Sequence, residues 1–529
     1  MNALHHFVSM HKFSDRREFL KILIGGTGAA YLALQGCGRD ASSEMQQITD
    51  YNSATLLKRQ RHSLAHKYLR DKSFDITLLK KTTIETDIVI IGGGASGLAA
   101  AITLQDAGYS FLLIENEAQL GGAGVKGLNN GISYPYGSVY FVDNSEKIQS
   151  LCKRAGKQCI AAPEDAVLYQ GQLIESIWSD KTISSLSLPT IEKDGMKRFR
   201  DVLLNDSLVP TYPLPKKLNS YEAGLDAQSS RKYLSEFRSP FLETLLDLYS
   251  KSSMGASIDE TNAYSLLNFY SAELGSEFGK ERFTFPGGMN GLYQVISSLI
   301  KPEFVKTESL AFALRNTTKG VEVDCIGNDQ ALTTIRAKKV IMTGQKHIAP
   351  FMIDDLSDDQ KSAMMSIQYP PYATIHLESR EEIFPNTIMD VWTPEANGFC
   401  TDIICSNSMN PIQKSKNTFM YSIFGAMPLH QRSLLLNDVE LAKYALDITT
   451  KTMKYLHKPM DIISSVEVFA WGHALAIPNP GSHNGPAQLA SRTHGNIHFG
   501  ASDNDAASSV ENALANGFAT AEEIIQKLS

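Results

Sequence analysis

The clearest pattern of apolar and polar positions lies between residues 86 and 115. Ile88 to Ile91 form a continuous run of β-branched residues, which is typical of a strand buried on both faces. A glycine-rich turn and a stretch of small residues follow, and this stretch stops at Gly108, a residue suited to ending a helix. A second apolar run, Phe111 to Ile114, comes next. The pattern predicts a strand, a helix and a second strand, as at the start of an α/β fold.

A different pattern occupies the segment from Ser309 to Met342, where short apolar and polar stretches alternate and predict several strands. No internal repeat is visible along the chain. Without the N-terminal signal predicted below, about 490 residues remain, more than one typical core holds, so we expect two domains that share a long interface.

The apolar stretch near the N-terminus, Ile22 to Leu34, predicts a targeting segment and not a part of the fold. Its length of about 13 residues is too short for a transmembrane helix but suits the hydrophobic part of a cleavable signal. Arg16 and Arg17 precede it and resemble a twin-arginine export signal, and Cys37 ends a stretch that resembles a lipoprotein box. Residues 1–37 therefore predict a periplasmic protein anchored to the membrane through lipidated Cys37. The alternative is an amphipathic helix with a chance pair of arginines.

Net charge and cysteine content exclude only a few classes of function. The net charge of −7 gives no support to nucleic-acid binding. Residues 38–84 are expected to form a tether and a basic helical segment, either as a solvated helix face or resting on anionic headgroups. The cysteines after Cys37 lack the spacing of metal ligands, so no metal site is expected. Cys400 and Cys405 could form a disulfide or remain buried thiols.

The turn after the first predicted strand carries the strongest chemical signal. Gly92 permits a tight turn, Gly94 lets the backbone approach a pyrophosphate, and Gly97 allows close packing of helix on strand. The helix begins at Ala95 and Ser96, where free N–H groups and the helix dipole favour an anion. This GxGxxG arrangement predicts a dinucleotide-binding unit.

An acid and a second pair of glycines extend this motif. Glu115 ends the second strand and is placed to accept hydrogen bonds from a ribose. Gly121 and Gly122 follow, and the spacing resembles the Glu-x5-Gly-Gly signature of flavoproteins of the glutathione-reductase and amine-oxidase superfamily. Ala123 stands where an arginine often follows in that signature. The resemblance implies that the cofactor is FAD and not NAD.

The far end of the chain, residues 497–525, resembles the closing element of the same superfamily. The resemblance places Asp503 near the ribityl and pyrophosphate groups of FAD. It also places the N–H groups of Ser508, Ser509 and Val510 near the negative charge that develops on the flavin.

Two further stretches resemble flavin amine oxidases such as monoamine and polyamine oxidases and, more faintly, exported relatives of spermidine dehydrogenase. Gly137 and Ser138 lie in a segment that passes beside the isoalloxazine in this family, and Ala311 corresponds to a residue that contacts the adenine. The family implies an α/β protein of two domains, with a Rossmann-like FAD-binding domain and a discontinuous substrate domain of mixed sheet and helices. The FAD-binding domain is expected at 85–145, 285–345 and 465–529, and the substrate domain at 146–284 and 346–464.

Candidate catalytic residues come from the same resemblance. Trp471 lies in WGHALAIPNPG and fits a segment that walls the flavin cavity in amine oxidases. His473 is either a proton acceptor at this cavity or a satisfied core residue. Tyrosines near predicted turns are candidate aromatic walls or simple packing residues: Tyr134, Tyr136, Tyr140 and Tyr372.

One feature departs from the family pattern. Many relatives hold a lysine near flavin N5, on a strand that corresponds here to residues 372–377. That strand has no lysine, and Thr374 or His376 occupies the neighbourhood. This difference weakens the case for a mechanism like that of monoamine oxidase.

The resemblance implies oxidation of a small-molecule amine, polyamine-like or amino-acid-like, by hydride transfer to FAD, with a quinone or cytochrome as a conceivable electron acceptor. A desaturase or isomerase of the phytoene-desaturase or protoporphyrinogen-oxidase type is the first alternative, and it predicts an apolar tunnel instead of an acid-lined cavity. A non-catalytic binding lipoprotein is the second.

Overall fold

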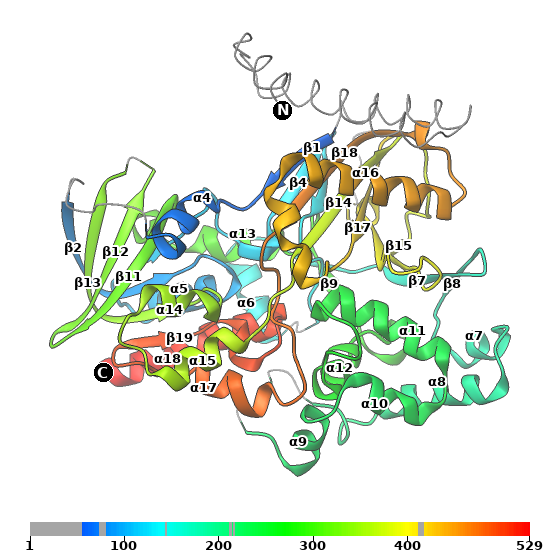
Figure 1. Ribbon diagram of the computed structural model, residues 1–529, viewed down its shortest axis with the longest axis horizontal. Coiled ribbons are helices and arrows are strands. Elements are labelled where there is room, and N and C mark those ends of the chain that lie inside the picture. The colour runs from blue at the N-terminus through cyan, green and yellow to red at the C-terminus, as the bar shows by residue number, and fades with distance from the viewer. Residues whose placement is uncertain are drawn as a thin grey trace, which may run out of the picture.

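Two large sheets with helices around them make up most of the described protein (Figure 1). The structure, a computed structural model, describes residues 55–72, 81–142, 145–210, 214, 217–328, 330–410 and 417–529. The signals predicted within residues 1–37 lie outside this part of the chain. Across the described ranges, no helix combines the length and hydropathy needed to cross a membrane.

The first sheet confirms the predicted strand–helix–strand unit. β2 (Lys81–Ile91) pairs in parallel with β3 (Phe111–Ile114) on one side and with β13 (Leu332–Met342) on the other. The segment predicted to alternate forms an antiparallel meander that ends in β13. The other strands of this sheet are β10 (Val305–Lys306), β11 (Ser309–Thr317), β12 (Gly320–Gly327) and β19 (Ile497–Phe499).

Helices from both ends of the chain cover the first sheet. α5 (Ala95–Asp106) crosses α18 (Val510–Leu528) so closely that a Cβ on Gly517 would lie 2.1 Å from the carbonyl oxygen of Ser96. α6 (Glu146–Arg154) and α13 (Asn290–Leu299) contribute to the same buried core. The first and last segments of the dinucleotide unit are therefore assembled into one body.

The second sheet has eight strands, six of which come from the segments expected in the substrate domain. In sheet order they are β1 (Thr55–Arg59), β18 (Ile463–Trp471), β14 (Tyr372–Ser379), β17 (Phe419–Phe424), β16 (Asp402–Cys405), β15 (Ile388–Trp392), β7 (Glu164–Tyr169) and β8 (Gln172–Glu175). α16 (Asp438–Tyr455) packs on this sheet.

A group of helices lies below this sheet in Figure 1 and forms a core of its own. They are α7 (Asp180–Ser185), α8 (Thr190–Leu203), α9 (Ser220–Asp226), α10 (Ser230–Leu234), α11 (Pro240–Tyr249) and α12 (Ala263–Tyr270). Two small sheets join the domains: β4 (Lys126–Asn129) with β5 (Ile132–Pro135), and β6 (Ile160–Ala161) with β9 (Phe283–Thr284). The predicted α/β class with a Rossmann-like domain and a mixed-sheet domain is confirmed.

The structure moves two of the expected domain boundaries. β18 was expected in the FAD-binding domain, but its backbone pairs with β1 and β14 of the second sheet. α14 (Ala349–Met352) and α15 (Asp358–Ser366) were expected in the substrate domain, but their apolar side chains fill the core of the first sheet. In both cases pairing or burial between distant segments, which no local pattern reports, decides the assignment.

The basic segment before residue 84 also differs from expectation. Residues 55–59 form strand β1 and not a helix, and only α4 (Ser63–Ala65) and a following turn of π-helix, His66–Arg70, are helical there. Lys58 and Arg59 pair with Glu467 and Asp438 at 2.8 and 2.6 Å. The interpretation of a solvated helix face is therefore wrong for these residues.

Cys400 and Cys405 are separate buried thiols, so the structure supports the second of the two alternatives for them. In the described part of the chain, no cluster of His, Cys, Asp and Glu has a geometry that could hold a metal ion.

Candidate functional site

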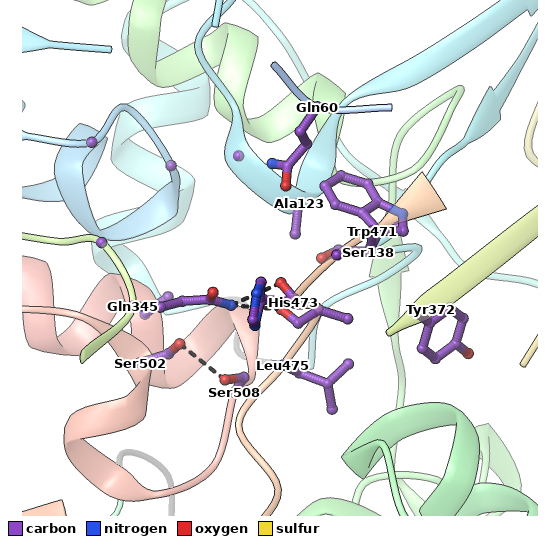
Figure 2. Close-up of a pocket in the computed structure, with 18 of the residues that line it drawn as sticks. Gln60, Ala123, Ser138, Gln345, Tyr372, Trp471, His473, Leu475, Ser502 and Ser508 are labelled. Atoms are coloured by element: carbon purple, nitrogen blue, oxygen red, sulfur yellow. Dashed lines mark hydrogen bonds between the residues drawn. The ribbon is translucent and has the colours of Figure 1, made fainter. Parts of the chain in front are cut away.

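A cavity of about 970 Å³ lies between the two sheets and receives side chains from both domains. This volume is at the upper end of the range of about 300–1,000 Å³ typical of ligand sites. Most residues singled out for the cofactor or for catalysis lie on its wall; the exceptions are Gly97, Tyr134, Tyr136 and His376. Figure 2 shows part of this wall, with Trp471, Tyr372 and His473 facing a common space.

The glycine loop forms one end of the cavity. Gly92 has a φ of +103°, a backbone conformation that favours glycine, at the turn out of β2. A Cβ on Gly97 would lie 1.9 Å from the carbonyl oxygen of Gly92, so Gly97 serves helix–strand packing and not ligand contact. Gly94, Ala95 and Ser96 line the cavity at the N-terminus of α5. The loop thus offers an anion site on free N–H groups.

Backbone conformation and close packing against the first loop explain why the second pair of residues is glycine. Gly121 and Gly122 have φ values of +133° and +52°, and a Cβ on Gly122 would come within 3.0 Å of the Cα of Gly94. Any side chain there would push apart the two loops that line this end of the cavity.

Glu115 organises the strand end beside these loops. Its Oε2 accepts a hydrogen bond from the N–H of Gly93 at 2.6 Å, and its Oε1 accepts one from the N–H of Glu117 at 2.7 Å. Burial raises the pKa of the Glu115 carboxyl above its usual range, although both backbone bonds act in the opposite direction. Its carboxylate can accept further bonds, since it offers about four acceptor positions.

The segment at residues 59–70 completes this end of the cavity, a role that no pattern in the sequence indicated. Arg61 donates its backbone N–H to Glu117 at 2.8 Å and its Nη1 to the carbonyl oxygen of Asn116 at 2.5 Å. Residues of this segment that line the cavity are Arg59, Gln60, Arg61, His62, Ala65, His66, Leu69 and Arg70. Ala311 lies at the same end, buried on β11.

The start of α18 forms another part of the wall. Ser509 caps the helix by accepting a hydrogen bond from the N–H of Asn512 at 3.0 Å, and Ser508, Ser509 and Val510 line the cavity. The geometry therefore fits both a plain capped helix and a helix whose N-terminal N–H groups face a ligand.

Asp503 lines the cavity but already has a partner that the sequence did not indicate. Lys346, fully buried, donates from Nζ to Oδ1 at 2.6 Å and from its backbone N–H to Oδ2 at 2.8 Å. The hydroxyl of Tyr369 also donates to Oδ2, at 2.5 Å. The carboxylate charge of Asp503 is thus compensated within the protein, which leaves only its remaining acceptor positions for a ligand.

Trp471 anchors the loop that carries Gly137 and Ser138. Its Nε1 donates to the carbonyl oxygen of Tyr136 at 2.9 Å, and the hydroxyl of Thr374 donates to the same oxygen at 2.9 Å. A Cβ on Gly137 would lie 2.3 Å from the carbonyl oxygen of Ala123 and 3.4 Å from the Trp471 ring. The indole therefore forms part of the wall (Figure 2). Its hydrogen bond to Tyr136 fixes the neighbouring backbone.

The four tyrosine candidates divide into two groups. Tyr140 and Tyr372 line the cavity. Tyr134 and Tyr136 lie behind the wall, where Tyr134 donates to Glu467 at 3.0 Å and the Tyr136 ring stacks on Phe469 at 4.5 Å. His376 packs against both of these rings and is buried, so of the two replacements for the missing lysine only Thr374 lines the cavity.

His473 faces the cavity as an uncharged ring. It stacks on His347 with the ring centres 4.3 Å apart. Burial, together with His347, Arg432 and His66, lowers the pKa of His473 to about 3. A proton acceptor that titrates near 6.5 does not fit this position.

We expect a His473→Gln variant to keep the shape of the pH–rate profile between about pH 5 and 8, because the ring is neutral throughout that window. Its stability should change instead. In the unfolded wild-type chain, His473 binds a proton below about pH 6.5, whereas in the folded protein it binds one only near pH 3. The free energy of unfolding therefore decreases as the pH falls from about 6.5 toward about 3. Thermal unfolding measured from pH 7 to 4 should show less acid sensitivity in the variant. A kinetic limb near pH 6.5 that disappears in the variant would contradict this assignment.

The second sheet presents acids and aromatic rings to the cavity, and sequence reasoning missed them. Asp390 and Trp392 of β15 lie on the same face as Asp402 and Ile404 of β16, because Trp392 pairs with Asp402 and Asp390 with Ile404. Together with Phe424 of β17, all of them line the cavity. Acids inside such short apolar strands, IMDVW and DIIC, were the available signal.

Another acid on this side of the cavity, Glu273, belongs to a network of hydrogen bonds and ion pairs. It accepts hydrogen bonds from the Tyr140 hydroxyl at 2.6 Å, the Tyr249 hydroxyl at 3.1 Å and Arg282 Nη1 at 2.9 Å. Arg282 also binds both oxygens of Asp165, at 2.7 and 2.9 Å. The single guanidinium is therefore shared by two acids on this side of the cavity.

Comparison with known proteins agrees with this organisation. Residues 90–155 match the family profile of the NAD(P)-binding Rossmann-like domain. A stretch of 94 residues is 39% identical to the FAD-dependent oxidoreductase dbaF of Emericella nidulans, but it covers only 17% of this chain and 19% of that protein. The sequence likeness thus concerns one region and not the whole molecule.

Solved structures resemble the chain over a much larger part. Wild-type putrescine oxidase bound to putrescine superimposes with a TM-score of 0.64 at 16% identity, covering 84% of this chain and 100% of that one. Cyclohexylamine oxidase from Brevibacterium oxydans does so with a TM-score of 0.65 at 17% identity, covering 84% and 99%. The protein has an amine-oxidase fold. An Exiguobacterium protein assigned as a protoporphyrinogen oxidase is also similar, with a TM-score of 0.60 at 15% identity over 85% and 99%, so this fold does not select a substrate.

Proposed function

We propose that the protein is an FAD-dependent oxidoreductase that oxidises an amine. The residues at one end of the cavity fit FAD: Gly94 leaves room for a pyrophosphate, the N-terminus of α5 would face it, and Glu115 would accept hydrogen bonds from the ribose. Ala311 and the segment at 59–70 would enclose the adenine. Sequence relatives named as FAD-dependent oxidoreductases support the choice of FAD over NAD.

FAD, when bound, would accept a hydride from the carbon next to the amine nitrogen. Two electrons and the hydrogen of that C–H bond would leave the amine, which would become an iminium ion. Water would then hydrolyse the iminium ion to an aldehyde or ketone, with release of ammonia or an amine. The protein's own part is to bind and orient the amine. Trp471 and Tyr372 wall the reaction space, and the loop at Gly137 and Ser138 is held in place by Trp471. Positioning and desolvation of this kind are what such a transfer needs.

The observation that carries the proposal is the acid-lined, aromatic chamber that opens into the dinucleotide cavity. Asp390 and Asp402 would be costly to bury beside an apolar polyene or porphyrinogen. Among the described residues neither forms a salt bridge, and Arg282, the cation that acts on Asp390, already pairs with Asp165 and Glu273. An ammonium compound instead gains from them. This favours an amine over the desaturase or isomerase alternative, and an intact cofactor cradle argues against a non-catalytic binding protein.

The test is an anaerobic screen of the purified yellow protein. Loss of flavin absorbance near the visible maximum should follow addition of amines but not of carotenoid precursors or porphyrinogens. Bleaching by an apolar substrate alone would establish the alternative enzyme class, and a protein that never takes up FAD would leave only the binding role.

We further propose export by the twin-arginine route and anchoring through Cys37, with a quinone or cytochrome accepting electrons from the reduced flavin. A protein that acquires FAD while folding is suited to a route that carries folded cargo. Arg16→Lys with Arg17→Lys should leave the protein in the cytoplasm, whereas Cys37→Ala should release it from membranes. Unchanged membrane fractionation of both variants would contradict the proposal.

A further inference from the structure

A buried lysine lies behind the part of the cavity wall that carries Asp503. Lys346 is fully buried, and it is the only buried lysine among the described residues. It does not line the cavity itself, whereas Asp503 does. A lysine is almost never fully buried unless a partner compensates its charge. The cost of burying this charge indicates that the ammonium group serves the wall residue with which it pairs.

The pairing of two strands brings these residues together. β13 and β19 are neighbours and run in parallel. Lys346 begins the 3₁₀ turn that follows β13, and Asp503 lies in the 3₁₀ turn that follows β19. Both therefore lie beyond the carboxyl ends of parallel strands, where ligands bind in open α/β sheets. Gln345 and Ser502, which directly precede them, line the cavity (Figure 2).

Hydrogen bonds fix the orientation of the Asp503 carboxylate. Its Oδ1 accepts a bond from Lys346 Nζ, and its Oδ2 accepts bonds from the backbone N–H of Lys346 and from the hydroxyl of Tyr369. Lys346 Nζ also donates to Oδ1 of Asn504 at 2.6 Å and lies 5.5 Å from the centre of the Phe499 ring. Of about four acceptor positions on the carboxylate, one then remains for a ligand.

The charge of this part of the wall matters because the pyrophosphate of FAD is an anion. The family resemblance implies that Asp503 lies near the ribityl and pyrophosphate groups. A buried carboxylate without a cation would repel such a ligand, since two like charges disfavour each other strongly where water is excluded. The ammonium group of Lys346, 2.6 Å from Oδ1, brings the formal charge of the pair to zero.

We propose that Lys346 is a positioning residue of the FAD site, which orients the Asp503 carboxylate and cancels its charge so that the anionic cofactor can bind beside it. The ammonium group acts through Asp503 and not by contact with FAD. The inference rests on the FAD-binding part of the proposed function and is independent of the substrate that is oxidised.

The experiment measures the rate at which the diluted holoenzyme releases FAD, followed by the fluorescence of free flavin. Lys346→Met keeps the alkyl stem and removes the charge. At pH 8 this variant should release FAD at least about tenfold faster than the wild type, because Asp503 then stands beside the pyrophosphate as an uncompensated carboxylate. Lys338→Met is the matched control: it removes an exposed lysine of β13 that pairs with Asp87 at 2.8 Å, and it should release FAD at the wild-type rate.

The dependence on pH separates a charge effect from a loss of packing. In Lys346→Met the buried carboxyl group of Asp503 has no cation, so the excess release should be present at pH 8 and should fall below about threefold near pH 5.5 as that group takes up a proton. The neighbouring groups are present in the wild type too, which is the reference at each pH. Burial raises the pKa of Asp505, on which Lys346 also acts, to about 6 and lowers the pKa of His347 to about 4. Burial also raises the pKa of Tyr369 well above its ordinary value, so its hydroxyl keeps its proton.

A second substitution tests whether the effect passes through Asp503. When Lys346→Met is combined with Asp503→Asn, the pair is neutral again, so FAD release at pH 8 should return to within about threefold of the wild-type rate. Equally fast release by the single and the double variant would overturn the proposal. Release at the wild-type rate by Lys346→Met, or fast release that does not change with pH, would overturn it as well.

A further comparison applies if Lys346→Met does not fold, because breaking a buried ion pair is more damaging than removing both of its charges. Asp503→Asn alone, which retains Lys346, should then release FAD at least about threefold more slowly than the double variant, since the remaining positive charge favours the pyrophosphate. Equal rates in these two variants would overturn the proposal. A wild-type protein that holds no FAD would refute the proposed function and this inference together, whereas the other contrary outcomes refute this inference alone.

Discussion

A Gly94→Val variant is expected to fold and to contain no FAD. Within the protein, a Cβ on Gly94 would meet only the Cα of Gly122, at 3.7 Å, which is an ordinary contact. The φ of −75° at this position is allowed for any L-residue, so no backbone strain arises. The branched side chain instead occupies the space where the pyrophosphate must approach the backbone. Flavin absorbance of the purified protein should be lost while circular dichroism and thermal unfolding remain close to those of the apo wild type.

Two neighbouring changes separate ligand loss from fold loss. Gly97→Ala should impair folding itself, because its Cβ would sit 1.9 Å from the carbonyl oxygen of Gly92. Glu115→Ala should weaken FAD binding in a graded way, by about 1.5–3 kcal/mol, which corresponds to about ten- to a hundredfold in affinity. Gly224→Val, at a site with nothing within 4 Å, is the control that should retain FAD. Full flavin occupancy in Gly94→Val would refute the cofactor assignment.

A Trp471→Ala variant is expected to keep FAD and to lose most of its turnover. The indole contacts the loop at Gly137 and holds the carbonyl of Tyr136, whereas the pyrophosphate and ribose positions lie on other elements. Misplacement of a substrate by about 1 Å costs about a hundredfold, and the loss of a whole cavity wall should reach at least that size. The measurement is the anaerobic rate of flavin reduction at saturating amine, with flavin content determined in parallel.

The conservative variant Trp471→Phe tests which property of the indole matters. It retains a ring against Phe469 but removes the hydrogen bond from Nε1. A rate of flavin reduction between those of the wild type and Trp471→Ala would mean that part of the loss comes from the missing hydrogen bond that holds the loop at Gly137. A wild-type reduction rate in Trp471→Ala would instead mean that this tryptophan is core and that the reaction occurs elsewhere.

Sequence reasoning was strongest where structure depends on neighbouring residues. The turn at Gly92 and the helix that follows depend on backbone conformation and small side chains within about fifteen positions. The local sequence pattern therefore predicts them. The resemblance to amine oxidases extended this to Trp471 and to Ser509, which both lie on the cavity wall.

It was weakest where distant segments meet. Neither β1 nor the Lys346 partner of Asp503 follows from local pattern, because each depends on a contact across more than a hundred positions. Asp390 and Asp402 look like ordinary polar residues until β15 and β16 pair and turn them to the same buried face. The chemistry that distinguishes this chamber therefore emerged only from sheet register.

Strand β1 has a consequence for how long the cofactor stays in place. Thr55 pairs with Val466, more than four hundred positions later, and the residues directly after β1 form the cavity wall beside Glu117. This segment is an edge strand joined by a few backbone bonds and ion pairs, so it opens more readily than the central strands. FAD would then exchange through local unfolding of this edge, and its residence time would report the stability of β1 and not the strength of the pyrophosphate contacts alone.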